Sequence, residues 1–181
     1  MKKLKTTEMN RLTPDEFRTA PKIPVVIVLD NIRSQNNTGS VFRTADAFRL
    51  EGIYLCGITA TPPHREIHKT ALGATDSVSW TYFPETIRAL ESLRNEGYLL
   101  IGVEQTTTGK TLDQFYPKKG KKYALIFGNE VNGLDETLIP RLDDCIEIPQ
   151  FGTKHSLNVS VAAGIVVWHM FSLLNDFHHS K

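Results

Sequence analysis

The sequence predicts an α/β fold with a mostly parallel sheet and helices on both faces. Short runs of Val, Ile and Leu without polar alternation recur along the chain, which is typical of strands buried on both faces of a parallel sheet. Segments with helical spacing of apolar residues separate these runs, and such alternation favours parallel βαβ units. The 181 residues, 40% hydrophobic and 23% charged, suffice for one domain with a buried core.

Residues 1–22 are predicted to form a short basic arm ahead of a single domain of residues 23–181. Lys and Arg outnumber Asp and Glu in the arm. Thr13, followed by Pro14 and two acidic residues, is typical of a helix start, because Thr accepts a backbone N–H and Pro is tolerated in the first turn. One short helix is therefore expected in the arm.

The first half of the domain begins with a strand at residues 25–29. A polar loop follows, and Asn37 or Thr38 is expected to cap the next helix because both side chains accept hydrogen bonds from a first turn. The next strand covers residues 53–56. Residues 64–72 have helical spacing, and the glycine that follows ends that helix.

The middle of the chain repeats this alternation. Residues 78–83 are interpreted as an edge strand. Pro84 begins a helix that extends to Asn95, and a buried strand follows at residues 98–103. A short helix is expected within residues 112–116, before a turn rich in lysine.

The last third contains two further strands, each followed by a loop rich in polar residues and glycine. The strand at residues 123–127 stops at a glycine, and the strand at residues 145–149 leads to a polar segment that opens a long helix at Ser156. In open α/β sheets, ligands bind beyond the carboxyl ends of the strands. These two loops are therefore the predicted ligand site.

Several functional classes are excluded by what the sequence lacks. It has no P-loop, no GxGxxG fingerprint and no GxSxG elbow. Cys56 and Cys145 lie in apolar runs and are interpreted as buried thiols, while His64 and His68 lack the acidic partner of a zinc motif, so no metal is expected. With no signal-peptide pattern and no apolar run of ~20 residues, the expected location is the cytoplasm. The net charge of +1 decides nothing about nucleic acid.

Three polar clusters interrupt the apolar pattern, at residues 36–43, 128–134 and 156–160. In the first, Asn37 and Arg43 form either a helix cap with a surface Arg or a pair that projects toward a phosphate or a sugar hydroxyl, which the planar guanidinium suits. The glycines of the second allow φ > 0 and a close approach of backbone to ligand. The third lies at a helix start, where backbone N–H groups are free.

Together these clusters resemble the three motifs of the SpoU (TrmH-like) RNA 2′-O-ribose methyltransferases of the SPOUT superfamily. Motif 1 is similar to residues 37–48, motif 2 to residues 125–134, and motif 3 to residues 146–149 with 156–162. The likeness covers residues 25–175, nearly the whole chain.

The resemblance implies a C-terminal trefoil knot, in which the segment around residues 150–156 passes through an earlier loop. It also implies S-adenosylmethionine as cofactor and a homodimer formed through the C-terminal helix. The implied cofactor-binding residues are Thr106, Gly128, Asn129, Gly133, Ile148 and Leu157.

The resemblance further implies roles for side chains. The implied catalytic residues are Arg43, Asn37, Ser156, Asn158 and Glu130. In the family the motif 1 Arg is proposed to deprotonate or orient the 2′-hydroxyl; because Arg stays protonated in proteins, a phosphate clamp is physically easier to defend. The expected RNA-binding residues are Arg43, His64, Arg65, Lys118 and Lys119, and the arm is either solvated or in contact with RNA phosphates.

The predicted function is therefore methyl transfer from S-adenosylmethionine to a ribose 2′-hydroxyl of tRNA or rRNA, with neither DNA nor a membrane as partner. Two alternatives remain open. One is a catalytically inactive, cofactor-binding protein associated with RNA, and the other is methylation of a base nitrogen by an enzyme of the same superfamily. The residues do not distinguish tRNA from rRNA.

Overall fold

The computed structural model describes residues 2–5, 8 and 11–176. These residues form a seven-stranded sheet in the order β3-β2-β1-β6-β4-β7-β5, in which all paired strands run parallel. The strands are β1 (Ile23–Asp30), β2 (Leu50–Cys56), β3 (Trp80–Phe83), β4 (Tyr98–Val103), β5 (Lys110–Thr111), β6 (Lys122–Phe127) and β7 (Asp144–Glu147). The predicted α/β class with a parallel sheet is confirmed.

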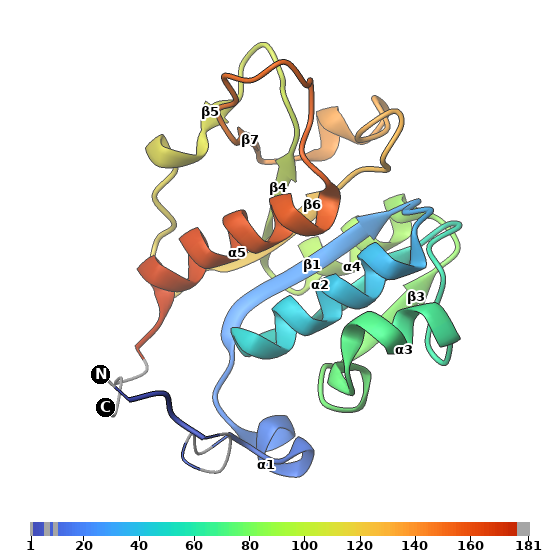
Figure 1. Cartoon of the computed structure of the whole chain (residues 1–181). Coiled ribbons are helices and arrows are strands. Elements are labelled where there is room, and N and C mark those ends of the chain that lie inside the picture. The colour runs from blue at the N-terminus through green and yellow to red at the C-terminus, as the bar shows by residue number, and fades with distance from the viewer. Residues whose placement is uncertain (1, 6–7, 9–10, 177–181) are drawn as a thin grey trace.

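Helices cover both faces of this sheet (Figure 1). On one face α2 and α5 lie side by side and α3 packs against α2, whereas α4 covers the other face. The helices are α1 (Pro14–Thr19), α2 (Gln35–Ala47), α3 (Arg65–Ala71), α4 (Thr86–Asn95) and α5 (Val159–Leu174), with short 3-10 helices η2 (Ala74–Asp76), η3 (Leu112–Gln114) and η4 (Ile139–Arg141).

The sheet divides the hydrophobic interior into two cores, and the interior strand β1 contributes to both. Its side chains alternate across the sheet, as the period of a strand requires. Val25, Ile27 and Leu29 join the core beneath α2 and α5. Val26 and Val28 join the core beneath α4. Burial on both faces explains why β1 is continuously apolar.

Helix α1 docks part of the N-terminal arm onto the domain. Thr13 caps it as predicted: its hydroxyl accepts a hydrogen bond from the Glu16 backbone N–H at 3.3 Å, and the Glu16 carboxylate accepts one from the Thr13 backbone N–H at 2.8 Å. Phe17 is buried in the main core. The Arg18 guanidinium donates to the carbonyl of Asp76 at 2.8 Å.

The predicted cap of α2 was wrong. Ser34 is the N-cap, and its hydroxyl accepts a hydrogen bond from the Asn37 backbone N–H at 3.2 Å, so Asn37 and Thr38 lie inside the first turns. The reason is a carboxylate from elsewhere: Glu130 accepts hydrogen bonds from the Arg33 and Ser34 N–H groups and fixes the helix start there. Similarly, α5 begins at Val159 rather than Ser156.

Among the described residues, no helix is both long and apolar enough to cross a bilayer. Within the same part of the chain, no group of three or more His, Cys, Asp and Glu side chains is arranged to hold a metal ion.

Candidate active site

A cavity of about 470 Å³ opens at the carboxyl ends of β4, β6 and β7. Because these strands are parallel, the loops that follow them meet at one edge of the sheet. Its lining comes from three segments, within residues 103–105, 127–133 and 147–162. A volume between about 300 and 1,000 Å³ is typical of a small-molecule site.

The loop after β6 is a tight, internally bonded turn. The backbones of Asn129 and Gly133 exchange two hydrogen bonds of 3.0 Å, and the Asn129 side-chain oxygen accepts from the N–H groups of Val131 and Asn132 at 2.9 Å. Gly133 has φ of +70°, in the left-handed region that favours glycine. A Cβ on Gly128 would overlap the Gly133 backbone, so the turn closes only with glycine there.

Glu130 joins this loop to the start of α2. Its carboxylate accepts hydrogen bonds from the backbone N–H of Arg33 at 3.0 Å, from that of Ser34 at 3.2 Å and from the Asn37 amide at 3.0 Å. Partial burial works to raise the pKa of Glu130, but these donors outweigh it and hold that pKa below its usual value. Glu130 is therefore an ionised brace between two of the polar clusters.

Asn37 continues the network to the third cluster. The Asn158 amide donates to the Asn37 side-chain oxygen at 3.0 Å. Asn158 also caps α5, because its own oxygen accepts from the Ser160 N–H at 2.9 Å and from the Ser160 hydroxyl at 2.6 Å. One chain of hydrogen bonds, Glu130–Asn37–Asn158, thus links segments separated by 93 and 121 positions.

Glu104 is a pocket residue that the sequence analysis missed. It follows β4 directly, and its carboxylate accepts hydrogen bonds from the backbone N–H of Gln105 at 2.9 Å and of Leu134 at 3.0 Å. It thereby ties β4 to the loop after β6. The available signal was a polar residue immediately after a buried strand, the same signal that marked the other loops.

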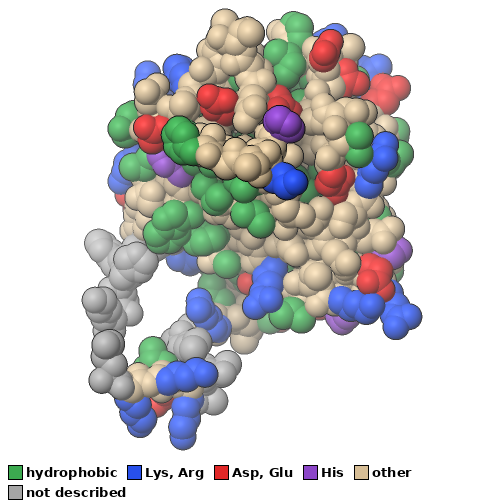
Figure 2. Space-filling model, turned by 45° about the horizontal axis from the view of Figure 1, so that its top comes forward, with side chains coloured by type: hydrophobic (Ala, Val, Ile, Leu, Met, Phe, Trp, Pro, Cys, Tyr) green, Lys and Arg blue, Asp and Glu red, His purple; other side chains and the backbone are tan. Residues whose placement is uncertain are grey.

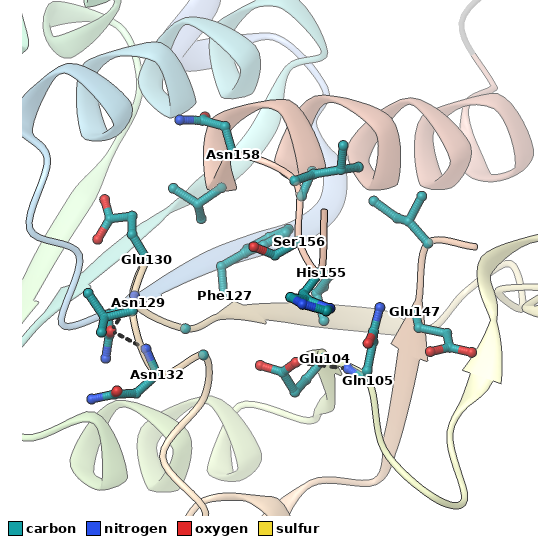
Figure 3. A pocket seen from close by; sticks show the side chains of 18 of the residues that line it. Glu104, Gln105, Phe127, Asn129, Glu130, Asn132, Glu147, His155, Ser156 and Asn158 are labelled. Atoms are coloured by element: carbon teal, nitrogen blue, oxygen red, sulfur yellow. Dashed lines mark hydrogen bonds between the residues drawn. The ribbon is translucent and has the colours of Figure 1, made fainter. Parts of the chain in front are cut away.

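The cavity brings together most of the predicted cofactor-binding residues and several of the predicted catalytic residues. The predicted cofactor-binding residues that line it are Gly128, Asn129, Gly133, Ile148 and Leu157, and the predicted catalytic residues that line it are Glu130, Ser156 and Asn158. Figure 3 shows Asn129, Glu130 and Asn132 along one side, Glu147 on the opposite side, and Asn158 at the start of α5. Asn37 reaches this group through Glu130 and Asn158 rather than by lining the cavity.

The other predicted residues lie outside this cavity. Arg43 is exposed on α2 and lines a separate groove between α2 and α3, while His64 and Arg65 line a hollow beside α3. The Thr106 hydroxyl is buried beside Gly109.

Two predicted RNA-binding lysines lie at the opposite end of the sheet from the cavity. Lys118 and Lys119 precede β6, so they lie at the amino end of that strand whereas the cavity lies at its carboxyl end. Lys119 forms an ion pair with Asp176 just beyond α5.

The SpoU rRNA Methylase family model matches residues 24–168 of the chain. The chain belongs to this family. The matched range includes Glu130, Asn37 and Asn158. It therefore covers all three segments that this hydrogen-bond network joins.

Curated relatives are longer than this SpoU chain. A Synechocystis protein described as an uncharacterized tRNA/rRNA methyltransferase is 32% identical over 162 residues, which cover 87% of this chain and 40% of the relative. The Vibrio parahaemolyticus 23S rRNA (guanosine-2′-O-)-methyltransferase RlmB is 29% identical over 161 residues, 89% of this chain and 64% of RlmB. The chain therefore spans less than two thirds of either relative.

Solved structures share the fold. The crystal structure of an AdoMet-bound rRNA methyltransferase from Sinorhizobium meliloti matches with a TM-score of 0.77 and 26% identity, covering 90% of this chain and 60% of that one.

Proposed function

We propose that this SpoU-family chain is an S-adenosylmethionine-dependent methyltransferase that modifies a ribose 2′-hydroxyl of tRNA or rRNA. The Glu130–Asn37–Asn158 network carries the proposal, because it joins the three family motifs at the edge of a cavity of suitable size. The RlmB relative, whose name specifies 2′-O-methylation of a guanosine, supports the choice of ribose over a base nitrogen. Residues 23–181 would form the methyltransferase domain, residues 1–22 would form a short arm beside it, and the protein would act in the cytoplasm.

The residues present fit the cofactor. At Gly128 the backbone leaves no room for a side chain, so main-chain groups rather than side chains face the cavity there. The backbone of Asn129, Gly133, Ile148 and Leu157 would hold the adenosine and methionine parts. Carboxylates of Glu104 and Glu147 also line the cavity and favour a ligand with positive charge. When bound, S-adenosylmethionine supplies a methyl group activated by its sulfonium.

The chain's own residues would then position the acceptor. A ribose hydroxyl is a weak nucleophile, so holding it in line contributes much of the rate. Ser156 lies at the cavity mouth near Asn158, where both could contact the ribose. Arg43, which remains protonated, would hold a phosphate of the RNA rather than remove a proton.

Replacement of Arg43 tests this role. Arg43→Ala should lower the rate of methyl transfer by about 100-fold, the scale of losing one positioned electrostatic donor. Its affinity for S-adenosylmethionine, measured by calorimetry, should stay unchanged because Arg43 lies outside the cavity. Turnover equal to that of the unaltered protein would remove Arg43 from the mechanism.

The exposed face of α5 supports a homodimer. Val161, Ile165 and Trp168 recur at helical spacing on its surface, and Trp168 is 55% exposed. Figure 2 shows hydrophobic side chains gathered on this face of the molecule. Sedimentation should give a dimer, and Trp168→Glu should shift it to monomer.

The knot is part of the same proposal. Residues after β7 line one cavity with the segments after β4 and β6, so they lie against both earlier loops as a threaded segment would. A crystal structure that traces residues 150–156 relative to the loop after β4 tests the threading.

Methyl transfer to RNA tests the whole proposal. The protein is incubated with labelled S-adenosylmethionine and total RNA from cells that lack its gene, and the RNA is digested to nucleosides. Label in one 2′-O-methylnucleoside is expected, and separate tRNA and rRNA fractions identify the substrate. Label in a base supports base methylation, whereas cofactor binding without label, on intact ribosomal particles as well, supports the inactive alternative.

A further inference from the structure

Trp80 is an exposed aromatic residue at the edge of the sheet. It begins β3, which pairs only with β2, and its side chain is 37% exposed. Within the described part of the chain, no recorded aromatic pair or cation–π contact includes Trp80. A large ring left free in this way is available to a ligand.

Two hollows flank Trp80, and their charges differ. One, of about 580 Å³, lies between α3 and β3, and its charged or titratable lining residues are His64, Arg65, His68, Lys69 and Asp76. The corresponding residues of the other hollow are Glu51, Tyr54, Glu96, Tyr98 and Lys122. The α3 side is the less acidic of the two and the more favourable for an anion, because two fixed cations and two histidines there accompany Asp76 and the adjacent Glu66, whereas two carboxylates accompany one cation in the other hollow.

Both cations of the first hollow are paired with one exposed carboxylate, that of Glu66. The Arg65 side chain is 85% exposed and lies 4.0 Å from the Glu66 carboxylate, while Lys69 lies 2.7 Å from the same carboxylate. Exposed pairs of this kind contribute little stability. A phosphate can therefore replace Glu66 as their partner at small cost.

This hollow is connected to the proposed catalytic residues through α3. Lys69 also lines the groove between α2 and α3 that contains Arg43. The two helices are in close contact, because the Thr70 hydroxyl donates to the Asn36 carbonyl at 2.9 Å, next to Asn37. Figure 2 shows Lys, Arg and His side chains, with an acidic side chain among them, toward the lower right of this face. Lys69 thus links the groove that contains Arg43 to the hollow beside Trp80.

We propose that the hollow between α3 and β3 binds an unpaired nucleotide of the RNA substrate, with its base stacked on Trp80 and its phosphates on Arg65 and Lys69. Nucleotide binding is inferred from the cations and the Trp80 ring. Only the identification of that nucleotide as part of the substrate rests on the proposed function. In an A-form duplex the bases are stacked inside and cannot reach such a ring. The substrate class is therefore RNA with unpaired nucleotides beside the target, such as a loop or bulge.

Fluorescence anisotropy with two labelled probes tests this. One probe is a single-stranded RNA of about 12 nucleotides, within the usual site sizes for such surfaces, and the other is a blunt duplex of the same sequence. Trp80→Ala should weaken single-strand binding roughly tenfold, the scale of one lost base stack, and leave duplex binding unchanged. Trp80→Phe, which keeps an aromatic face, should restore most of the affinity.

The contribution of Arg65 and Lys69 is measured separately, by the salt dependence of RNA affinity. Arg65→Ala/Lys69→Ala should reduce the slope of log affinity against log salt by about 1.4, because each phosphate contact with a single strand contributes about 0.7. Trp80→Ala should leave that slope unchanged, since stacking releases no counterion.

Matched variants control for general effects. Tyr82→Ala removes the neighbouring exposed aromatic of β3, which does not line the hollow, and should leave RNA affinity unchanged. Arg88→Ala/Arg141→Ala removes two exposed cations outside the cavity and both hollows, and should leave the salt slope unchanged. Affinity for S-adenosylmethionine should be the same in all variants.

The inference is overturned if Trp80→Ala binds the single strand as tightly as the unaltered protein, if Tyr82→Ala loses as much, or if the unaltered protein binds neither probe. A change of oligomeric state in Trp80→Ala would assign the hollow to a second copy of the chain instead. Methyl transfer distinguishes the two proposals: Trp80-dependent RNA binding without label in any 2′-O-methylnucleoside sinks the proposed reaction, whereas labelled ribose with unchanged variant affinities sinks only the Trp80 site.

Discussion

The two loops that face each other across the cavity are built differently. The loop after β6, residues 128–134, is held by its own backbone, by the Asn129 side chain and by the carboxylates of Glu104 and Glu130. Residues 148–157, which are all described, form no recorded hydrogen bond with any described residue. Phe151 within them is 98% exposed.

Because of this difference, we expect the two loops to have different functions in binding. A loop with its hydrogen bonds already formed presents fixed backbone groups to a ligand, so binding there requires little ordering. A segment without hydrogen bonds has low local stability and gains order only when something covers it. We therefore expect the loop after β6 to present preformed backbone groups to the cofactor, and residues 148–157 to become ordered when cofactor, RNA or a second subunit binds.

The largest expected effect comes from a methyl group on the rigid side. Gly128→Ala places a Cβ against the backbone of Gly133 and Leu134, which cannot move without breaking the turn. Affinity for S-adenosylmethionine, measured by calorimetry, should fall by about 100-fold or more. Gly152→Ala, in the opposite loop, is the matched control: a Cβ there meets nothing within 4 Å, so affinity should be unchanged. Equal losses in both variants would contradict the assignment.

A smaller effect is expected from Glu130, which joins the loop after β6 to the start of α2. Glu130→Ala leaves the N–H groups of Arg33 and Ser34 and the Asn37 amide without their acceptor. Because Asn37 no longer holds Asn158 in place, methyl transfer should fall by roughly tenfold, with affinity for S-adenosylmethionine changed much less. Single-turnover assays at saturating cofactor measure this. Glu136→Ala, another exposed acid in the same region, should behave as the unaltered protein.

The same comparison can be sharpened by hydrogen exchange. On addition of S-adenosylmethionine, amides within residues 148–157 should gain several-fold protection, whereas those within residues 128–134 should change little because they are already bonded. Gly128→Ala, which is expected to bind the cofactor far more weakly, serves as the reference at the same cofactor concentration. Larger gains in the loop after β6 would reverse the roles of the two sides.

The position of the site could be predicted from the sequence, but its hydrogen bonds could not. The polar clusters that follow apolar runs were sufficient to locate the site, because the carboxyl ends of parallel strands meet at one edge of the sheet. The partners within that edge depend on contacts across about 100 positions, such as Glu130 with Asn37. The cap of α2 shows the limit, because Ser34, Asn36, Asn37 and Thr38 all have side chains able to cap, and a distant carboxylate decides among them.

The predicted RNA-binding lysines show a different limit. Lys118 and Lys119 are near motif 2 in sequence, yet they precede β6 and lie at its other end. Because both lysines precede β6 in the sequence, their position at its amino end could have been predicted. His64 and Arg65 also lie away from the cavity, because they line the hollow beside α3 together with Trp80, the first residue of β3.

The smallest expected effect is the pH dependence of the brace. The pKa of Glu130 is lowered from 4.5 in the folded chain, so its hydrogen bonds contribute stability that is fully present above pH 4.5 and is lost as the pH falls through the folded pKa. Glu130→Gln cannot titrate, so its Tm should fall less than that of the unaltered protein between about pH 5 and pH 3. Because the carboxylate is largely exposed, the difference in the fall should be about 2 °C or less. Parallel acid curves for the two proteins, measured by circular dichroism, would show that the Glu130 carboxylate is not what ties the loop after β6 to the start of α2.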